Sequence, residues 1–408
     1  MAWLALLAAP LAASPAQEPI DTLAARLRRA ENAIAVLQQQ LSEQAESGAR
    51  ARSGMRIELH GRVMVNGFAN SRRVNNVDNP QIVRPDSVPG YPARGVGMAG
   101  RQTTLGLAVG ASDVLGGTFE GDLDVDFYGG QMPSPGGRTF PLVRLRTARA
   151  QVTWNAWSVL VGQESPLISA LNPVSPAAIG SPGFAASGNL WLWLPQVRAE
   201  WRSTGAARFG AQGAVLAPTS GDPAGVFDTD NDLAERSQRP YLQARAFLGW
   251  SGGAADLAGE IGCGVHQGWL VPAATRVASF AAACDALIPL RSWLEVRGEF
   301  FTGQALRGLG GGGIGQNFDA SNNPLRTTGG WAQLNVRPMH TLQVGAGCGG
   351  DHPRAAPARH RNDVCATYVT VRPSGPLFVG AEFRRIRTEH AAARYTNDHV
   401  TLSAGFEF

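Results

Sequence analysis

The chain has 408 residues, a formal net charge of +4 and 44% hydrophobic residues. After the N-terminus it contains no window of 18 or more apolar residues, which excludes a helical membrane protein. All 36 basic residues are arginines, and they are dispersed without a basic stripe interleaved with aromatic residues, so nucleic-acid binding is not expected.

The N-terminal residues are typical of a secretory signal peptide. The stretch MAWLALLAAPLAASPAQ has an apolar run followed by Ser14 and Ala16 at small-residue cleavage positions, although it lacks a positively charged start. We therefore expect a signal peptide over residues 1–16. Export makes the oxidising periplasm the relevant compartment for the cysteines.

A heptad pattern follows over residues 17–47 and predicts a periplasmic coiled-coil helix. Its a positions are Ile20, Leu27, Ile34 and Leu41, and its d positions are Leu23, Ala30 and Leu37. Three heptads are marginal as a free coiled coil, so the pattern favours chains that a larger structure already holds together. The alternative is a single amphipathic helix that lies on its own domain. Residues 48–56 are predicted to be a flexible linker.

From residue 57 onward the apolar residues alternate with a period of two, which is typical of β-strands. Sixteen segments show this pattern: 57–69, 101–110, 117–128, 142–154, 157–163, 191–203, 206–217, 239–251, 256–268, 276–288, 292–304, 327–337, 340–349, 362–372, 376–388 and 396–408. Short turns alternate with mostly long connections, such as 70–100, 164–190, 218–238, 305–326 and 350–361. An even number of strands with tight turns on one side predicts an all-β fold, a 16-stranded antiparallel transmembrane β-barrel over residues 57–408.

The tryptophans lie near strand ends, where indole rings favour the membrane interface. Trp154, Trp157, Trp201, Trp250 and Trp293 are close to short turns, and Trp191, Trp193, Trp269 and Trp331 are on the loop side. The final strand ends at Phe408, with Leu402, Ala404 and Phe406 predicted to face lipid while Thr401, Ser403 and Glu407 face water. We expect this strand to pair with 57–69 and close the barrel.

The alternation also assigns charged residues to the inner face. Four carboxylates share that face on 117–128, and because unpaired burial would be costly, we expect a water-filled lumen. The predicted inner residues are Glu58, His60, Arg62, Glu120, Asp122, Asp124, Asp126, Gln196, Arg198, Glu200, Arg202, Gln243, Arg245, Glu295, Arg297, Glu299, Gln333, Asn335, Arg337, Glu382 and Arg384. Acidic residues on one part of the barrel wall and arginines on other parts would create an electric field across the pore. The alternative is that these charges only hydrate the lumen and pair with one another.

Two local features concern strand register. Arg144 and Arg146 have the opposite parity to Arg149, which predicts a bulge or loop that interrupts 142–154. Cys263 and Cys284 lie symmetrically about one connection, and Cys348 and Cys365 about another. Facing residues of a hairpin are within disulfide range, so the spacing allows two disulfides on the outer face, with unpaired buried thiols as the alternative.

Enzymatic and metal-binding motifs are not found. His352 and His360 flank DHPRAAPARHR, which we interpret as a solvated loop, and GLGGGGIG over 308–315 is interpreted as a flexible loop. The sequence has no G-x-S-x-G, H-E-x-x-H or C-x-x-C motif. His60 and His399 lie on strands expected to be adjacent, but without a partnering nucleophile. We expect no cofactor, no metal site and no enzymatic activity.

Several stretches are similar to one known family. LHGRVMVNGFANSRRVNN (59–76), RQTTLGL (101–107), RLRTARAQ (144–151), VLVGQESPL (159–167) and SGNLWLWLPQVRAEW (187–201) resemble the DcaP-like trimeric porins of Gram-negative outer membranes. The likeness covers the first half of the barrel best. After Gly205 it depends on the strand count and the terminal Phe408, the kind of residue that the barrel-assembly machinery recognises in outer-membrane proteins.

The resemblance implies a homotrimeric, passive channel surrounded by outer-membrane lipid, with an arginine-lined constriction for small anionic solutes such as dicarboxylates. The residues carried over are Arg101, Arg144, Arg146 and Arg198. We expect the 164–190 connection to fold inward and narrow the lumen. Its lack of charge allows a weaker anion preference, or a preference for less polar solutes. The alternatives are a barrel enzyme of the lipase or protease type and a structural membrane anchor.

Overall fold

A computed structural model describes residues 49–50, 55–88, 93–130, 139–222, 230–252 and 257–408. The chain divides into two compact units, Met1–Arg56 and Ile57–Phe408. The predicted signal peptide (1–16) and coiled coil (17–47) lie outside the described residues, as does most of the predicted linker (48–56), where β1 (Ala49–Arg50) is described. These assignments stay predictions.

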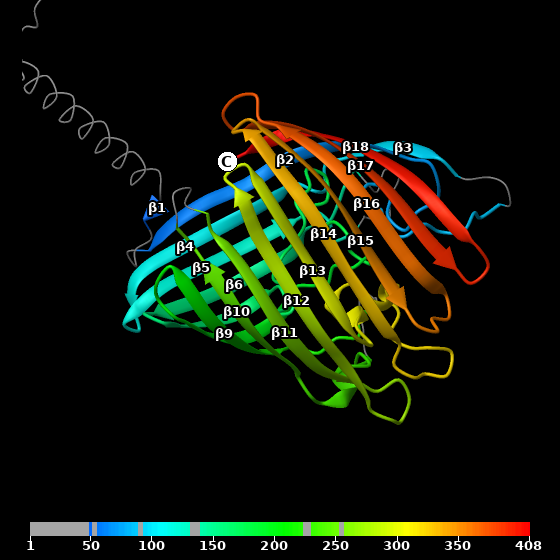
Figure 1. The fold of residues 1–408 in the computed structure, drawn as a ribbon, viewed down its shortest axis with the longest axis horizontal. Coiled ribbons are helices and arrows are strands. Elements are labelled where there is room, and N and C mark those ends of the chain that lie inside the picture. Colours follow the sequence, from blue (N-terminus) through cyan, green and yellow to red (C-terminus); the bar gives the residue numbers. More distant parts are fainter. Residues whose placement is uncertain (1–48, 51–54, 89–92, 131–138, 223–229, 253–256) are drawn as a thin grey trace, which may run out of the picture. The chain divides into compact units, whose positions relative to one another are not determined.

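The second unit contains a closed antiparallel barrel (Figure 1). Sixteen strands form the ring: β2 (Arg56–Asn70), β4 (Thr104–Val114), β5 (Gly117–Asp126), β6 (Arg144–Trp154), β7 (Trp157–Glu164), β8 (Leu194–Arg202), β9 (Ala207–Leu216), β10 (Tyr241–Trp250), β11 (Gly259–Leu270), β12 (Val277–Arg291), β13 (Leu294–Gln304), β14 (Arg326–Met339), β15 (Leu342–Pro353), β16 (Arg359–Val371), β17 (Leu377–His390) and β18 (Arg394–Glu407). A short extra strand, β3 (Gly95–Ala99), pairs with the end of β2. The predicted fold class is confirmed for the barrel.

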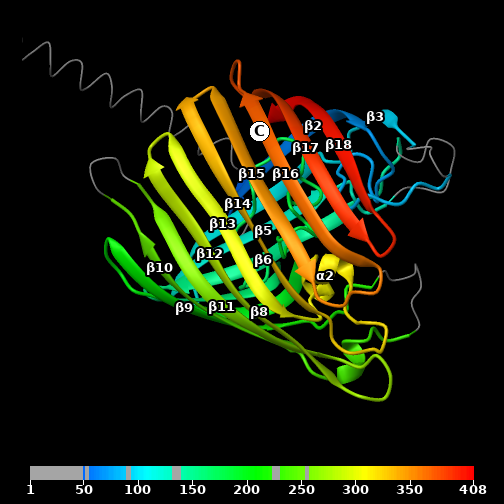
Figure 2. The same ribbon diagram turned by 45° about the vertical axis from the view of Figure 1, so that its right-hand side comes forward.

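The barrel closes where the last strand meets the first. β18 pairs with β2 in a register that runs from His399 opposite Asn70 to Glu407 opposite Arg62 (Figure 2). Leu402 and Phe406 are exposed on the outer face, whereas Thr401 is fully buried on the inner face. The alternation at the end of the chain is therefore the pattern of a closing strand, and the predicted partner is correct.

One long connection is shorter than predicted. The 350–361 loop is reduced to residues 354–358, because β15 continues to Pro353 and β16 begins at Arg359. His352 is therefore a strand residue, and its Nε2 lies 2.9 Å from Oδ1 of Asp363 on the neighbouring strand. Both histidines are exposed, as predicted, but they are strand residues and not loop residues. The loop assignment is wrong because polar strand ends beyond the apolar band resemble loop sequence.

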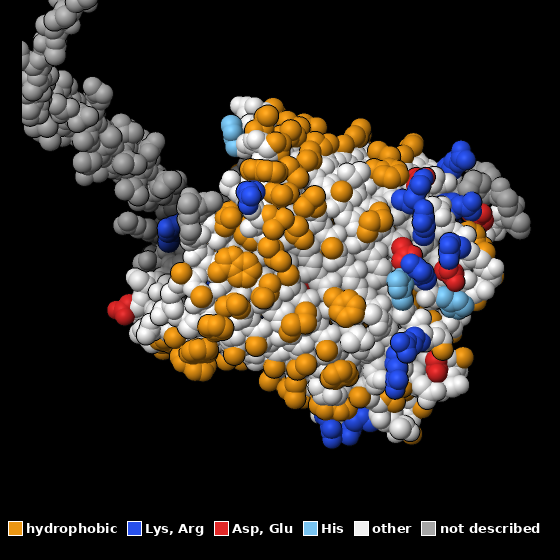
Figure 3. Space-filling model, in the orientation of Figure 1, with side chains coloured by type: hydrophobic (Ala, Val, Ile, Leu, Met, Phe, Trp, Pro, Cys, Tyr) orange, Lys and Arg blue, Asp and Glu red, His pale blue; other side chains and the backbone are white. Residues whose placement is uncertain are grey.

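The outer face carries the apolar residues of the strands. Figure 3 shows hydrophobic side chains spread over the barrel wall, while charged and histidine side chains gather toward one end of the strands. Trp157, Trp201 and Trp293 are exposed on this surface, as expected for interface residues. Trp331 is only 4% exposed, because it points inward and donates a hydrogen bond from Nε1 to Glu299. The predicted interface position of Trp331 is wrong.

Both predicted disulfides are present. Cys263 on β11 bonds Cys284 on β12, and Cys348 on β15 bonds Cys365 on β16, with Cα atoms 4.0 and 4.1 Å apart. Each pair occupies directly opposite positions in its hairpin. All four residues belong to the exposed, outward series of their strands, so the bonds join neighbouring strands on the lipid-facing surface.

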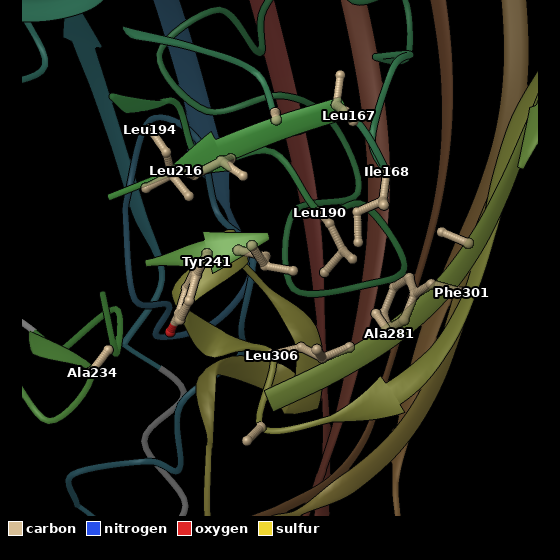
Figure 4. Packing of buried hydrophobic residues seen from close by; sticks show 14 of the residues in the cluster. Leu167, Ile168, Leu190, Leu194, Leu216, Ala234, Tyr241, Ala281, Phe301 and Leu306 are labelled. Carbon is tan, nitrogen blue, oxygen red and sulfur yellow. The ribbon is translucent and has the colours of Figure 1, made fainter. Parts of the chain in front are cut away.

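A hydrophobic cluster lies inside the barrel (Figure 4). Leu167, Ile168 and Leu190, from the connection between β7 and β8, pack with Tyr241, Phe301 and other wall residues. The glycine-rich stretch contributes η2 (Arg307–Leu309) and α2 (Gly312–Gly315), and Leu309 and Ile314 are fully buried. The prediction of a flexible loop is therefore wrong, because the side chains of Leu309 and Ile314 are buried and Leu309 belongs to the hydrophobic cluster. In the described part of the chain, helices that are long and apolar enough to cross a membrane are not found.

Candidate functional site

Residues 165–193, between β7 and β8, form an inward segment that crosses the inner wall of the barrel. The Leu167 amide donates to Gln243 on β10 at 2.7 Å, and the Leu171 amide donates to Glu299 on β13 at 2.8 Å. Because these partners are inward-facing strand residues, the expectation that this connection folds into the barrel is confirmed.

The inward segment continues across β14 and β17. The Val174 amide donates to Oε1 of Gln333 at 2.7 Å, and Nε2 of Gln333 donates back to the Val174 carbonyl at 2.8 Å. The Ser175 hydroxyl bonds Glu382 on β17. Many of the wall's inner polar residues therefore satisfy the backbone of the segment, which would otherwise be buried without partners.

Glycines on the wall allow the segment to approach closely. A Cβ on Gly380 would lie 2.6 Å from Cβ of Pro176, and one on Gly349 would overlap the Ser187 carbonyl oxygen. Gly188 itself has φ of 105°, a conformation that favours glycine, and it lies against the backbone of Gly330. Sequence reasoning missed these positions, although glycine at inward positions of a strand is a signal for close backbone approach.

The far part of the segment reaches β6 and the connections that follow β2 and β3. The Ile179 amide donates to Oε1 of Gln102 at 2.7 Å, and Nδ2 of Asn79 donates to the Ser181 carbonyl at 2.8 Å. Arg144 on β6 also donates to the Gly180 carbonyl. The segment is thus held at both ends and along its length.

A bulge in β6 brings three arginines to the carboxylates of β5. Asp124 pairs with Thr147 and Val125 with Leu145, so Arg146 is the extra residue. The bulge predicted from the parity of Arg144, Arg146 and Arg149 is confirmed.

Two of these arginines share one carboxylate. Arg144 donates from Nε and Nη2 to the two oxygens of Asp126, at 3.1 and 2.6 Å, whereas Nε of Arg146 lies 3.7 Å from Oδ2. That Nε atom is buried and has no hydrogen-bond partner among the described residues. The group formed by Arg144, Arg146 and Asp126 carries a formal charge of +1.

Trp193 of the inward segment lies beside this charged group. Its ring centroid is 5.4 Å from Cζ of Arg144 and 5.1 Å from Cζ of Arg146. Both guanidinium groups can therefore interact with the indole, which favours cations near its face. Trp193 was predicted at the membrane interface, and this is wrong because the segment that carries it turns into the barrel.

Arg101 has a different environment. Its guanidinium bonds both oxygens of the fully buried Asp78, with Nε 2.7 Å from Oδ2, and lies 4.0 Å from the ring of Tyr128. Burial alone would lower the pKa of Arg101, but the hydrogen bond and charge of Asp78 raise it above its usual value. Burial, together with Asp78, raises the pKa of Tyr128, which stays a neutral phenol. Arg101 therefore joins two connections of the chain and is largely removed from the lumen.

Arg198 holds the start of the inward segment. Its Nη2 donates to the Ser165 carbonyl at 2.6 Å and to Gln196 at 3.0 Å. Within the described ranges, a carboxylate is not found within 4.0 Å of this guanidinium. Arg198 is thus a lumen cation whose charge is not balanced by direct contact.

Most of the other predicted lumen arginines, and Arg149 of β6, are paired with acids. The pairs are Arg62 with Glu407, Arg149 with Asp122 and Glu164, Arg202 with Glu200, Arg245 with Asp285 and Glu260, Arg297 with Glu295, and Arg384 with Glu382. Asp124 accepts from Thr147 at 3.1 Å and lies 3.9 Å from His60. Arg337 is exposed at the short-turn end of β14. Acids and arginines therefore interleave on the wall, and the alternative of mutual pairing holds for most of them.

Within the ranges that the structure describes, histidine, cysteine and acidic side chains do not form a group of three that could hold a metal ion. His60 and His399 are also far from each other. His399 is opposite Asn70, ten residues along β2 from His60, which corresponds to about 33 Å of strand. His399 is buried and bonds Asn70 and Thr401.

Comparisons with known proteins agree on the fold. Family profiles do not match the chain, and curated protein sequences do not match it either. Among solved structures, the outer membrane channel DcaP of Acinetobacter baumannii has a TM-score of 0.69 at 16% identity, and the match covers 89% of this chain and 100% of DcaP. The anion-selective porin of Comamonas acidovorans has a TM-score of 0.56 at 13% identity, covering 87% and 100%.

The trimer form of OmpT of Vibrio cholerae is similar at a TM-score of 0.52 and 10% identity, covering 87% of this chain and 99% of OmpT. At such identities the likeness concerns the fold. The closed ring of sixteen strands, the apolar outer face and the inward segment agree with it. The chain thus has the sixteen-stranded fold of Gram-negative outer-membrane porins, and its predicted resemblance to the DcaP-like porins is confirmed at the level of that fold.

Proposed function

We propose that this chain is a passive diffusion channel of the Gram-negative outer membrane that admits small hydrophilic solutes and favours anions such as carboxylates and dicarboxylates. The observation that carries the anion preference is the sharing of Asp126 by Arg144 and Arg146. A guanidinium that is not saturated by protein carboxylates can hold a solute carboxylate transiently with two parallel hydrogen bonds.

The inward segment supports a selective pathway. It contains no charged residue over 165–193, so the electrostatic preference comes from the facing wall. Apart from Arg337 at the short-turn end of β14, Arg146 and Arg198 are the predicted lumen arginines with the least direct neutralisation by acids of the described residues. Because most other arginines are paired, the anion preference is expected to be modest. Arg101 holds two connections of the chain together and is not expected to contact solutes.

The proposal also includes a homotrimer in which the 17–47 helices associate in the periplasm, with outer-membrane lipid around the barrels. Phe408 would be the residue that the barrel-assembly machinery recognises. The trimeric OmpT form supports this assembly by analogy of fold. Mass measurement of the purified protein in detergent tests it, and a monomeric mass for the full chain would contradict it.

Planar-bilayer recording of the purified protein tests the channel. We expect stepwise conductance and, under a salt gradient, a reversal potential on the anion-selective side. Absence of conductance would refute the channel, whereas conductance with cation selectivity would refute only the anion preference. A barrel enzyme is disfavoured because His60 and His399 are separated along their strands and His399 is bonded to Asn70 and Thr401.

A further inference from the structure

A polar groove opens on the outer surface of the barrel at the long-connection end of β12, β13 and β14. Its volume is about 290 Å³, and its lining includes Arg326, Arg354, Thr302, Thr328, Gln304 and Phe280. These residues point away from the lumen, since Thr302 and Thr328 belong to the exposed series of their strands. The groove is therefore unrelated to the proposed solute pathway.

The two arginines are adjacent. The Arg354 amide donates to the Arg326 carbonyl at 2.8 Å, which places the two residues opposite each other just beyond the paired part of β14 and β15. Both side chains are exposed. In the described ranges, carboxylates do not lie within 4.0 Å of either guanidinium. The groove thus presents two positive charges without a protein counter-ion.

Three other outward arginines toward this end of the barrel are paired with acids. Arg385 makes two hydrogen bonds to Asp398, at 2.7 and 3.0 Å, and Arg394 bonds Glu389 at 2.6 Å. Arg361 similarly bonds Asp363 at 2.6 Å. Figure 3 shows basic and acidic side chains mixed together beyond the hydrophobic surface of the wall. Arg326 and Arg354 differ from them because their charge is available to an external anion.

Hydroxyl groups and apolar side chains complete the groove. Thr302 and Thr328 are directly opposite, with their Oγ1 atoms 3.3 Å apart, and each can also bond an anion. Phe280, opposite Gln304, is 43% exposed, and Phe300, the next outward residue below Thr302, is 55% exposed. Phe280 lies in the row of Gln304 and Arg326, and Phe300 lies further along the wall than Thr302 and Thr328. Charged groups with one aromatic ring beside them and another further along the wall match a molecule with an anionic head and acyl chains.

We propose that Arg326, Arg354, Thr302 and Thr328 bind the phosphate headgroup of an anionic lipid in the outer leaflet. Two arginines can hold a phosphomonoester through paired hydrogen bonds. A zwitterionic headgroup binds them less well, because its own ammonium group already balances the charge of its phosphate. The acyl chains would then lie along Phe280 and Phe300. The occupant is a lipid and not free phosphate, because the groove lies on the outer, lipid-facing surface of the wall and Phe280 is part of its lining.

Native mass spectrometry of the full-length protein in detergent tests this site with dioleoyl phosphatidic acid and dioleoyl phosphatidylcholine as probes. We expect wild-type protein to retain phosphatidic acid about tenfold better, and Arg326→Gln/Arg354→Gln to lose most of this preference. Arg385→Gln is the matched control, since it removes an outward arginine that Asp398 already neutralises, and it should keep the preference. Heat-dependent gel migration confirms that each variant is a folded barrel.

Three results would overturn the proposal. The first is equal retention of the two lipids by wild-type protein, and the second is an unchanged preference in the double variant. The third is displacement of phosphatidic acid by excess inorganic phosphate, which would indicate a simple anion site. Loss of oligomers in the double variant with the lipid preference intact would assign the arginines to a contact between barrels and would also refute the lipid site.

Discussion

Arg146 lies 3.7 Å from Oδ2 of Asp126, a carboxylate whose two oxygens are already hydrogen-bonded to Arg144. A carboxylate that is saturated by one arginine leaves the second with an incompletely balanced charge. Trp193 covers one side of both guanidinium groups. This relationship separates Arg146 from the paired arginines elsewhere in the lumen, and it gives the proposed anion preference its sharpest test.

Replacing Arg146 with Gln should shift the channel toward cations. The change removes a charge but no direct hydrogen bond that holds the inward segment, so the pathway should keep its shape. We expect the anion-to-cation permeability ratio, from reversal potentials in a salt gradient, to fall about two- to threefold. Arg144→Ala/Arg146→Ala should shift it in the same direction, although Arg144 also anchors Gly180.

Arg291→Gln is the control for this experiment, because it removes the same charge at a short turn where the guanidinium bonds only the Leu290 carbonyl among the described residues. Its selectivity should match that of the wild type. If Arg146→Gln has wild-type selectivity as well, the arginines of β6 only hydrate the wall.

Replacing Gly380 with Val should displace the inward segment. The new side chain would occupy the position of Pro176, since a Cβ alone would lie 2.6 Å from the proline Cβ. Overpacking of this kind costs about 1–3 kcal/mol of unfolding free energy, unless the segment moves to relieve it. Single-channel conductance and urea unfolding together measure the two outcomes.

Gly213→Val provides the comparison, because a Cβ at this position on β9 has no neighbour within 4 Å. It should change neither quantity. Wild-type conductance and wild-type stability in Gly380→Val would show that the segment does not lie against β17 in the membrane.

Replacing Glu299 with Ala should loosen the middle of the inward segment. The Leu171 amide and Trp331 Nε1, 2.8 and 3.2 Å from the carboxylate, would lose their acceptor, as would the Ser169 hydroxyl. Each buried group left unsatisfied costs about 1–3 kcal/mol. We expect lower thermal stability and noisier single-channel currents.

Glu299→Gln should be less destabilised than the Ala variant, since its amide oxygen can still accept from Leu171 while its nitrogen can donate to Ser169, although Trp331 Nε1 loses its acceptor. Equal destabilisation by the Ala and Gln variants would assign the effect to lost charge and not to lost hydrogen bonds.

Replacing Cys263 and Cys284 with Ala should lower the unfolding free energy by at most about 3 kcal/mol, the loop-entropy value for a sequence separation of 21 residues. The real effect should be smaller, because neighbouring strand pairs already restrict this hairpin in the barrel. Chemical unfolding of the variant and non-reducing peptide mapping of the wild type provide the measurements. Peptide maps that pair Cys263 with Cys348 or Cys365 would contradict the register of β11 and β12.

The barrel could be predicted because its strands alternate with little interruption. Val400, Leu402 and Phe406 specify one face and Thr401 and Ser403 the other, and a shift of one residue would exchange the two faces. The same reasoning located the β6 bulge and placed all four cysteines outward. Where alternation holds, side-chain parity is a direct consequence of backbone geometry.

The interior could not be predicted in the same way, because the inward segment has no periodic pattern. Trp191 and Trp193 have the composition of an interface girdle, yet Trp193 lies beside arginines in the lumen. Leu309 and Ile314 are surrounded by glycines that suggest mobility, but they are buried. Their positions depend on contacts with distant strands, as does the pairing of Arg62 with Glu407.

The outward position of the disulfides also fixes an order of events. Thiol oxidation and exchange proceed through thiolates, which an apolar surrounding disfavours. Once β11, β12, β15 and β16 face acyl chains, the sulfur atoms of both hairpins are removed from aqueous oxidants and reductants alike. The bonds must therefore form while the chain is still in the periplasm, and after insertion the bilayer itself protects them from reduction.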